Sequence, residues 1–407
     1  MRILHTSDWH LGKRLEEFSR FDEQQAVLNE ICEIAENEQT DAVIIAGDLF
    51  DTFNPSAEAV DLFYKTLKRL SGDGKRAVIC IAGNHDSPER IEAPDPLARE
   101  CGIIFSGLPE TEVAVFSIES GLKVTRSDKG FIELTLPGSV YPLRLLLTPY
   151  ASELRLKKYL GSENSEEEMR SLLQARWKDL ADKYCDSQGV NVLLAHLFMI
   201  KQGVPPGPEP DDERPILHPG GAEAIYTSCI PGQIRYAALG HLHRKQVMDN
   251  SPCPVVYPGS PLSYSFSEAG QDKYVIIIDA EPGTQVKTRE LKLKSGKRLL
   301  RKRFELIDEA VAWLKENQES IVEITIVSET FLTAADRKRL VDAHSSILII
   351  PEMKNPLQAS DAAGLRVDLK RGINDLFFDF FKKEKGQEPG VDIMSLLNEI
   401  ISKEDNP

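Results

Sequence analysis

The sequence predicts a layered α/β protein with a largely parallel sheet at the centre of its first domain. Continuous apolar runs such as Ala42–Ala46 and Ala77–Ala82 alternate with segments such as Phe21–Glu38, where apolar residues recur at helical spacing. Apolar runs of this kind are typical of strands covered on both faces, and their alternation with helices favours parallel pairing. After Gly102 short strands are separated by turn residues, which predicts a β-rich second half.

The elements of this first domain follow in order along residues 1–280. Strands are predicted at 3–6, 42–46, 77–82, 113–118, 122–126, 131–136, 143–147, 190–195, 236–239, 255–257 and 274–279. Helices are predicted at 21–38 and 56–70, and a third begins at a capping box of Ser165 and Glu168 and ends near Cys185. Residues 203–221 are rich in Pro, Gly and acidic side chains and predict a long surface loop.

Three further segments complete the chain. Residues 281–302 are interpreted as a basic linker, and residues 303–365 as a small α/β domain of the order strand–helix–strand–helix–strand. Its predicted elements are 303–306, 308–316, 321–327, 334–343 and 347–350. Residues 373–404 predict two amphipathic helices separated by Gly386 and Pro389-Gly390.

Composition excludes several classes of protein. The 407 residues include 49 basic and 64 acidic side chains, a net charge of −15 that argues against a generally basic coat for nucleic acid. No apolar run approaches the roughly 20 residues of a membrane span, and the first residues do not form a signal peptide. The six cysteines form no C-x-x-C pair, so neither a disulfide framework nor a zinc–thiolate site is indicated. We therefore expect a cytoplasmic protein with no membrane partner.

Five clusters of potential metal ligands each follow a predicted strand. They are Asp8 with His10, Asp48 with Asp51, Asn84 with His85 and Asp86, His196, and His241 with His243. Ligands bind beyond the carboxyl ends of strands in open α/β sheets, so these loops are expected to converge. Carboxylate, amide and imidazole donors without thiolate suit Mn²⁺, Fe²⁺ or Zn²⁺.

The number of donors predicts two ions. The seven residues Asp8, His10, Asp48, Asn84, His196, His241 and His243 are too many for one ion but suit two ions that share a carboxylate. Such a site stabilises the attacking and leaving oxygens of a phosphoryl displacement, and metal-bound water supplies the nucleophile. Asp51 is interpreted as a supporting residue. The remaining histidines, His5, His218 and His344, are interpreted as structural or surface residues.

The order D-x-H, G-D-x-x-D, G-N-H-D, H, G-H-x-H resembles that of the calcineurin-like metallophosphoesterases. The segments 3–12, 238–244 and Tyr257-Pro-Gly-Ser-Pro261 are similar to those of the SbcD family, the nuclease subunits of bacterial SbcCD complexes. The resemblance implies a four-layer β-sandwich flanked by helices, a small α/β capping domain and C-terminal helices. Ala195 departs from the glycine that often precedes the isolated histidine, and only a minor backbone adjustment is expected.

The resemblance also implies roles for individual residues. One metal ion would be held by Asp8, His10, Asp48 and His243, and the other by Asp48, Asn84, His196 and His241. His85 would stabilise or protonate the leaving oxygen, oriented by Asp86. Two divalent ions are expected as cofactors, with Mn²⁺ as the expected metal.

The implied function is a two-metal DNA nuclease acting in double-strand-break repair and recombination, a 3′–5′ exonuclease and an endonuclease on ends and hairpins. The implied partners are DNA, an SMC-like ATPase (SbcC) bound by the C-terminal helices, and a second copy of the nuclease, bound through helices near 56–70 and 93–100. One alternative is a phosphomonoesterase or cyclic-nucleotide phosphodiesterase on the same scaffold, and another is a DNA-tethering scaffold with a structural metal site.

Two segments allow more than one interpretation. Lys287–Arg303 holds nine Lys or Arg residues and one acid, and is either a DNA phosphate contact or a solvated segment that protects a strand edge. The apolar stripe of the C-terminal helices either docks on the protein's own core or binds a partner. Its terminal position and clustered phenylalanines favour the partner.

Overall fold

The computed structural model describes residues 1–156, 165–204, 224–354, 376–378, 381 and 394. The predicted surface loop at 203–221, which includes His218, and the predicted helices at 373–404 lie almost entirely outside these residues. None of the described helices is long and apolar enough to span a bilayer.

The first domain contains two sheets. The six-stranded sheet has the order β18 (Lys287–Lys292), β17 (Tyr274–Asp279), β1 (Arg2–Thr6), β4 (Ala42–Ala46), β5 (Ala77–Ile81) and β6 (Ile103–Ser106). The strands from β1 to β6 are parallel, and β17 and β18 add an antiparallel edge.

The eight-stranded sheet pairs in the same mixed manner. Its order is β15 (Gln246–Asp249), β16 (Val255–Tyr257), β14 (Tyr236–Gly240), β11 (Val190–His196), β10 (Leu143–Thr148), β9 (Phe131–Thr135), β8 (Lys123–Asp128) and β7 (Phe116–Ser117). The central strands β16, β14, β11 and β10 are parallel, whereas both edges are antiparallel.

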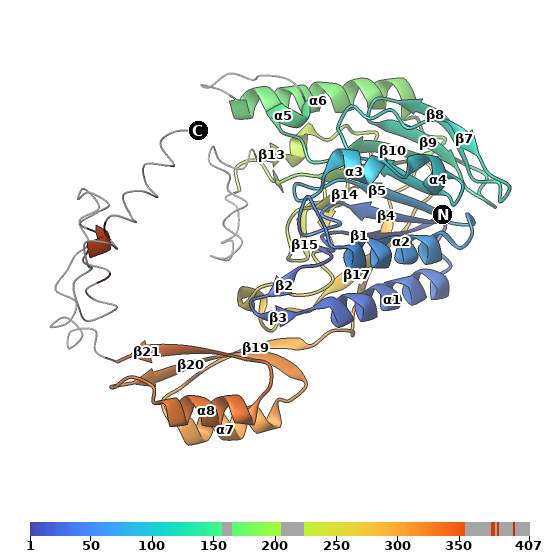
Figure 1. The fold of residues 1–407 in the computed structure, drawn as a ribbon. Helices are drawn as coiled ribbons and strands as arrows, with labels where there is room; N and C mark the ends of the chain where they lie inside the picture. Colours follow the sequence, from blue (N-terminus) through green and yellow to red (C-terminus); the bar gives the residue numbers. More distant parts are fainter. Residues whose placement is uncertain (157–164, 205–223, 355–375, 379–380, 382–393, 395–407) are drawn as a thin grey trace.

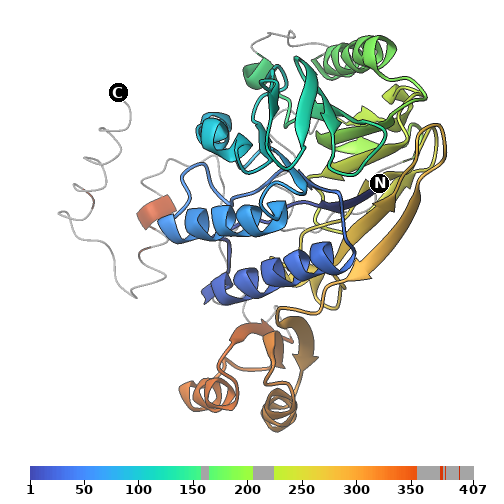
Figure 2. The ribbon, with the colours of Figure 1, turned by 90° about the vertical axis from the view of Figure 1, so that its right-hand side faces the viewer.

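The two sheets pack face to face, and helices cover their outer faces (Figure 1). Side chains from both sheets, such as Ile44 and Leu194, form the core between them. Helices α1 (Phe21–Asn37) and α2 (Ala57–Ser71) lie side by side on the six-stranded sheet, as Figure 2 shows in blue. Helix α6 (Ser165–Tyr184) covers the eight-stranded sheet. The predicted four-layer α/β sandwich is therefore confirmed.

Several short elements were not predicted from the sequence. They are β2 (Arg14–Leu15), β3 (Phe18–Ser19), α3 (Pro88–Glu92), α5 (Glu153–Leu156), β12 (Met199–Ile200), β13 (Ile225–Tyr226), η2 (Thr227–Cys229) and η3 (Phe266–Glu268), together with strands β6 and β15 of the two sheets. The helix expected near 93–100 is present as the short α4 (Asp95–Arg99). The predicted strand at 113–118 is reduced to Phe116–Ser117, because only these two residues pair with β8.

A small domain follows, with β19 (Arg298–Phe304), α7 (Ile307–Glu316), β20 (Ser320–Ser328), α8 (Ala334–Ala343) and β21 (Ile347–Met353). Its three strands are parallel, and both helices pack on one face of the sheet. Figure 1 shows that the other face is turned toward the first domain.

The interpretation of residues 281–302 as a linker is wrong. Residues 287–292 form an edge strand of the six-stranded sheet, and the small domain already begins at Arg298. An edge strand needs no apolar face. Its charged side chains form no apolar run by which the strand could be recognised in the sequence. Four cations of the basic segment pair with carboxylates of the protein: Arg289 with Glu38, Lys292 with Asp272, Arg301 with Glu323, and Arg303 with Glu352. On β18, the pairs of Arg289 and Lys292 favour the interpretation of this strand as a protected sheet edge.

Candidate metal centre

The loops that carry the predicted ligands meet at one edge of the sandwich. They follow β1, β4 and β5 of the first sheet and β11 and β14 of the second, all at carboxyl ends of parallel strands. Backbone hydrogen bonds join neighbouring loops: Asp8 N donates to Gly47 O at 3.0 Å, and His10 N donates to Asp48 O at 2.9 Å. The convergence predicted from the sequence is therefore present.

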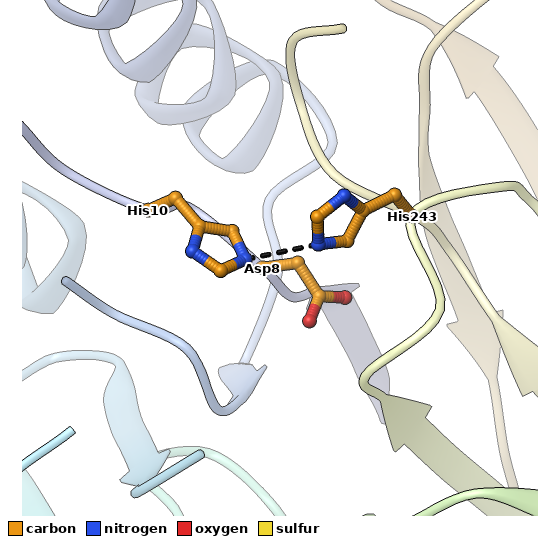
Figure 3. A group of neighbouring side chains, drawn as sticks. All are labelled: Asp8, His10 and His243. Carbon is orange, nitrogen blue, oxygen red and sulfur yellow. Dashed lines mark hydrogen bonds between the residues drawn. The ribbon is translucent and has the colours of Figure 1, made fainter. Parts of the chain in front are cut away.

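A first cluster consists of Asp8, His10 and His243, all buried (Figure 3). The two Nε2 atoms of His10 and His243 lie 3.0 Å apart, beside the carboxylate of Asp8. Burial lowers the pKa of His10 to about 4 and lowers that of His243 well below its usual value. Two neutral imidazoles and a carboxylate in contact are a donor set suited to a divalent cation.

A second cluster consists of Asp48, His196 and His241, with Asn84 between the two rings. His196 Nδ1 lies 2.7 Å from the carbonyl oxygen of Ala46, which only accepts, so Nδ1 carries the proton. His196 Nε2 lies 2.9 Å from Asn84 Oδ1 and 3.4 Å from Asp48 Oδ2. When the ring is neutral these three atoms are all acceptors, which is a donor set suited to a divalent cation.

The charges of the buried side chains also favour a bound cation. Burial disfavours the charged ring of His196, but the Asp48 carboxylate outweighs burial and raises the pKa of His196 to about 9. Burial raises the pKa of Asp8 to about 7. Positive charge placed beside the buried carboxylates of Asp8 and Asp48 would stabilise both, and divalent ions would supply it.

The approach of the loops depends on two glycines. A Cβ atom at Gly83 would lie 2.1 Å from Asp48 Oδ1, and one at Gly240 would lie 1.8 Å from the carbonyl oxygen of Ala46. No side chain fits at such distances. The glycines of G-N-H-D and G-H-x-H are therefore required for β5 and β14 to reach the end of β4.

His85 lies at the edge of both clusters and lines a cavity of about 730 Å³. Its backbone N donates to Asp48 Oδ1 at 2.9 Å, and its Nδ1 lies 2.8 Å from the carbonyl oxygen of Asp51. The carbonyl only accepts, so Nδ1 donates and the ring is oriented by Asp51. The Asp51 carboxylate lies 3.7 Å from His10 Nδ1 and 3.4 Å from Lys13 Nζ, in keeping with a supporting role.

Asp86 does not orient His85, contrary to the role expected for it. Its carboxylate accepts hydrogen bonds from the backbone N–H groups of Gly83, Leu49 and Phe50 at 2.8–3.0 Å. Asp86 is fully buried, and burial raises its pKa to about 6. It therefore ties the loop after β5 to the loop after β4.

Comparison with known proteins agrees with this geometry. Residues 1–245 match the model of the calcineurin-like phosphoesterase family. The SbcD subunit of the SbcCD nuclease from Bacillus subtilis (strain 168) is 36% identical over 410 residues, which cover 99% of this chain and 98% of that protein. The chain belongs to the SbcD family of calcineurin-like phosphoesterases. Its members are metal-dependent hydrolases of phosphoester bonds, so the resemblance stated from the sequence is confirmed.

Other matches are more distant. The SbcD subunit of the SbcCD nuclease from Rhodobacter capsulatus is 34% identical over 285 residues, which cover 70% of this chain and 67% of that protein. Among solved structures, TT1561 of Thermus thermophilus aligns with 12% identity and a TM-score of 0.37, over 71% of this chain and 98% of that chain. A dimetal phosphatase from Danio rerio aligns with the same identity and TM-score, over 73% and 99%.

The segment Tyr257–Pro261 of this SbcD-family chain supports the loop of His243. Ser260 N donates to the carbonyl oxygen of His243 at 3.1 Å, and Gly259, at a φ of 78°, lies where a Cβ atom would be 2.5 Å from that oxygen. The buried Lys273 also donates to His243 O at 3.1 Å and pairs with Glu268. No motif in the sequence links Lys273 to the site, because it lies 30 residues beyond His243.

Two further residues beside the site, Arg155 and Tyr150, are not part of the sequence motifs. Arg155 donates to the carbonyl oxygens of Gly83 and Asp86 at 2.7 and 2.8 Å, and so holds the loop that carries Asn84 and His85. The Tyr150 ring lies against His241, with centroids 6.3 Å apart. The position of Tyr150 could have been predicted from the sequence. It follows the carboxyl end of β10, as the proposed ligands follow the carboxyl ends of other strands.

Proposed function

We propose that the protein is a Mn²⁺-dependent DNA nuclease that hydrolyses phosphodiester bonds as a 3′–5′ exonuclease and an endonuclease on ends and hairpins. The observation that carries the proposal is the pair of adjacent ligand clusters beside His85, at the floor of a 730 Å³ cavity. The SbcD relatives are named as subunits of a nuclease, which supports a nucleic acid as the substrate. Repair and recombination of broken DNA would be the setting of the reaction.

The residues divide into two ligand sets. Asp8, His10 and His243 would hold one ion, and Asn84, His196 and His241 the other, with Asp48 shared. Asp48 suits the shared position because its Oδ2 lies 3.5 Å from His10 Nε2 and 3.4 Å from His196 Nε2. When bound, two divalent ions supply a nucleophile at neutral pH and offset the charge of the phosphate.

His85 would act on the leaving oxygen. Since its Nδ1 donates to the Asp51 carbonyl, the protonated ring can donate from Nε2 into the cavity. The main-chain hydrogen bond from His85 N to Asp48 links the position of the ring to that of the shared ligand.

The partners follow from the family. The B. subtilis and R. capsulatus relatives are named as subunits of SbcCD, and we infer that this chain binds an SbcC-like ATPase through residues 373–404 and pairs with a second copy of itself. The small domain would cap the catalytic cavity. Its place over the cavity supports this role, because Arg301 and Glu323 form part of the cavity wall.

The test is hydrolysis of a linear duplex and of p-nitrophenyl phosphate by the same preparation with Mn²⁺. We expect cleavage of the duplex that stops with EDTA and returns with added Mn²⁺. Products from duplexes labelled at the 5′ and 3′ ends identify the polarity. Hydrolysis of the small ester alone would replace the nuclease proposal with the phosphomonoesterase alternative, and binding of DNA without any hydrolysis would favour the scaffold.

A further inference from the structure

The catalytic cavity has walls from both domains. Its floor includes Asp48, His85 and His241 of the first domain, and its far wall includes Arg301 of β19 and Glu323 of β20. A substrate on the metal centre therefore lies between the two domains. The residues of the small domain that face the cavity can select what enters it.

Apolar packing holds the small domain in this place. Leu15 of the β2–β3 hairpin and Phe266 of η3 are buried against Leu299 and Ile321 on the face of the small domain's sheet that α7 and α8 leave open. Arg301 and Glu323 follow two residues later on their strands, on the same face, because alternate residues of a strand point the same way.

Two carboxylates of α1 also hold the segment that joins the domains. Glu30 accepts hydrogen bonds from the backbone N–H groups of Lys294 and Ser295 at 2.7–3.0 Å. Glu23 accepts one from Lys297 N at 2.5 Å and pairs with the buried Arg20. These contacts make the joint a fixed connection, so the far wall of the cavity has a defined position.

Arg301 is arranged to bind an anion from this wall. Glu323 is 5% exposed and accepts a hydrogen bond from Nε of Arg301. Among the described residues neither terminal nitrogen of Arg301 has a hydrogen-bond partner, and its side chain is 56% exposed. A guanidinium held at one edge by a buried carboxylate is oriented in advance, which reduces the entropy lost on binding a phosphate.

We propose that Arg301 binds the phosphate of a nucleotide next to the scissile one, and so makes the site selective for polynucleotide strands over small phosphate esters. This inference rests on the proposed nuclease function. A small ester on the metal centre has no second phosphate, whereas a strand that crosses the cavity presents one toward the far wall. Lys13, also in the cavity wall, is paired with Asp51 and is less available for this role.

The test compares Arg301→Gln with Arg303→Gln. Arg303 is a matched control because it lies on the same strand and face, is similarly exposed at 61%, and pairs with Glu352, but does not line the catalytic cavity. The measured quantity is kcat/KM for a single-stranded oligonucleotide divided by kcat/KM for bis(p-nitrophenyl) phosphate. We expect Arg301→Gln to lower this ratio about 10-fold, mainly through KM for the oligonucleotide.

Two further measurements separate substrate binding from a structural role. In Arg301→Gln the slope of log kcat/KM for the oligonucleotide against log salt becomes shallower by about 1, because one phosphate contact is lost. Arg301→Lys keeps the charge and restores most of the ratio. If Arg301→Gln is unstable because Glu323 is left unpaired, the double variant Arg301→Gln, Glu323→Gln removes that buried charge and gives the same result.

The inference is overturned if Arg301→Gln, or the double variant in its place, has the same ratio and salt slope as Arg303→Gln. Failure of the wild-type protein to cleave any oligonucleotide while it hydrolyses the small diester would instead overturn the proposed function. The two failures are thus distinguishable in one set of assays.

Discussion

Four of the proposed ligands adopt a backbone conformation that non-glycine residues rarely take. Asp8, His10, Asp48 and His241 have φ values of 54°, 45°, 49° and 113°. Each such residue costs on the order of 1–3 kcal/mol and persists only where its surroundings determine it. Here the surroundings are hydrogen bonds among the loops after β1, β4 and β14, which hold these side chains in place.

The role of His85 leads to the first prediction. We expect His85→Ala to retain two equivalents of Mn²⁺ and to lose a factor of about 10²–10⁴ in kcat on duplex DNA, because the general acid is absent while the ligands remain. Metal analysis of the dialysed protein and single-turnover cleavage measure the two effects. A variant that cuts as fast as the wild type would disprove the role, and loss of an ion would make His85 a ligand.

His5 predicts a pH effect on stability. It is fully buried between the sheets, where its ring nitrogens lie 3.1 Å from Tyr236 Oη and from the carbonyl oxygen of Leu239. Burial lowers the pKa of His5 from 6.5 to about 3. Between these two pH values the unfolded chain binds a proton at His5 that the folded chain does not. The neutral buried ring therefore contributes its full stability above about pH 6.5, and this contribution is lost as the pH falls toward 3.

The measurement is the free energy of unfolding of the metal-free protein at pH 7 and pH 5, for the wild type and for His5→Asn. We expect stability to fall between these values by less in the variant than in the wild type. Equal losses would show that His5 does not titrate in this way. The comparison isolates His5 because the other buried histidines are present in both proteins.

At the scale of elements, the approach of strand ends builds the site. The end of β14 touches the end of β4 at Gly240, where a Cβ atom would lie 1.8 Å from Ala46 O. Gly240→Ala should therefore lower the free energy of unfolding by about 1–3 kcal/mol or more and weaken Mn²⁺ binding, since His241 moves with the backbone.

The control for this prediction is Gly232→Ala, because a Cβ atom at Gly232 has no neighbour within 4 Å. Chemical denaturation and Mn²⁺ titration measure both variants. Equal stability of the two would show that the contact between β4 and β14 does not constrain the site.

The elements predicted correctly were those with a strong apolar signal. Strands β4, β5 and β11 are buried along their whole lengths and appear as continuous apolar runs. Helix α3 has only five residues, too few for a helical period to be recognised. The sequence predicts a linker at β18 because Lys287, Arg289 and Lys292 interrupt any apolar pattern in this edge strand.

At the scale of the whole molecule, the C-terminal segment predicts a separable function. We expect deletion of residues 373–407 to leave a folded, active nuclease that no longer co-purifies with a co-expressed SbcC subunit. The reason is that, within the described residues, the two sheets and the helices that cover them form apolar cores of their own. Co-purification and the cleavage assay measure the outcome.

A point variant controls for effects of truncation. Phe377 and Phe381 lie with ring centroids 5.9 Å apart, and the double variant Phe377→Asp, Phe381→Asp should also lose the partner while remaining folded. Aggregation or unfolding of both proteins would show instead that these helices pack on the protein's own core.

The sequence by itself determined which residues meet at the candidate metal centre, because each stands just after an apolar run and the carboxyl ends of parallel strands share one edge. It also determined the family through the order of those residues. Only the tertiary structure decided which groups orient them. Asp51 rather than Asp86 faces the ring of His85, and Arg155, Lys273 and Arg301 reach the site from distant parts of the chain. These contacts depend on how loops and domains pack, and strand and helix periodicity carries no information about such packing.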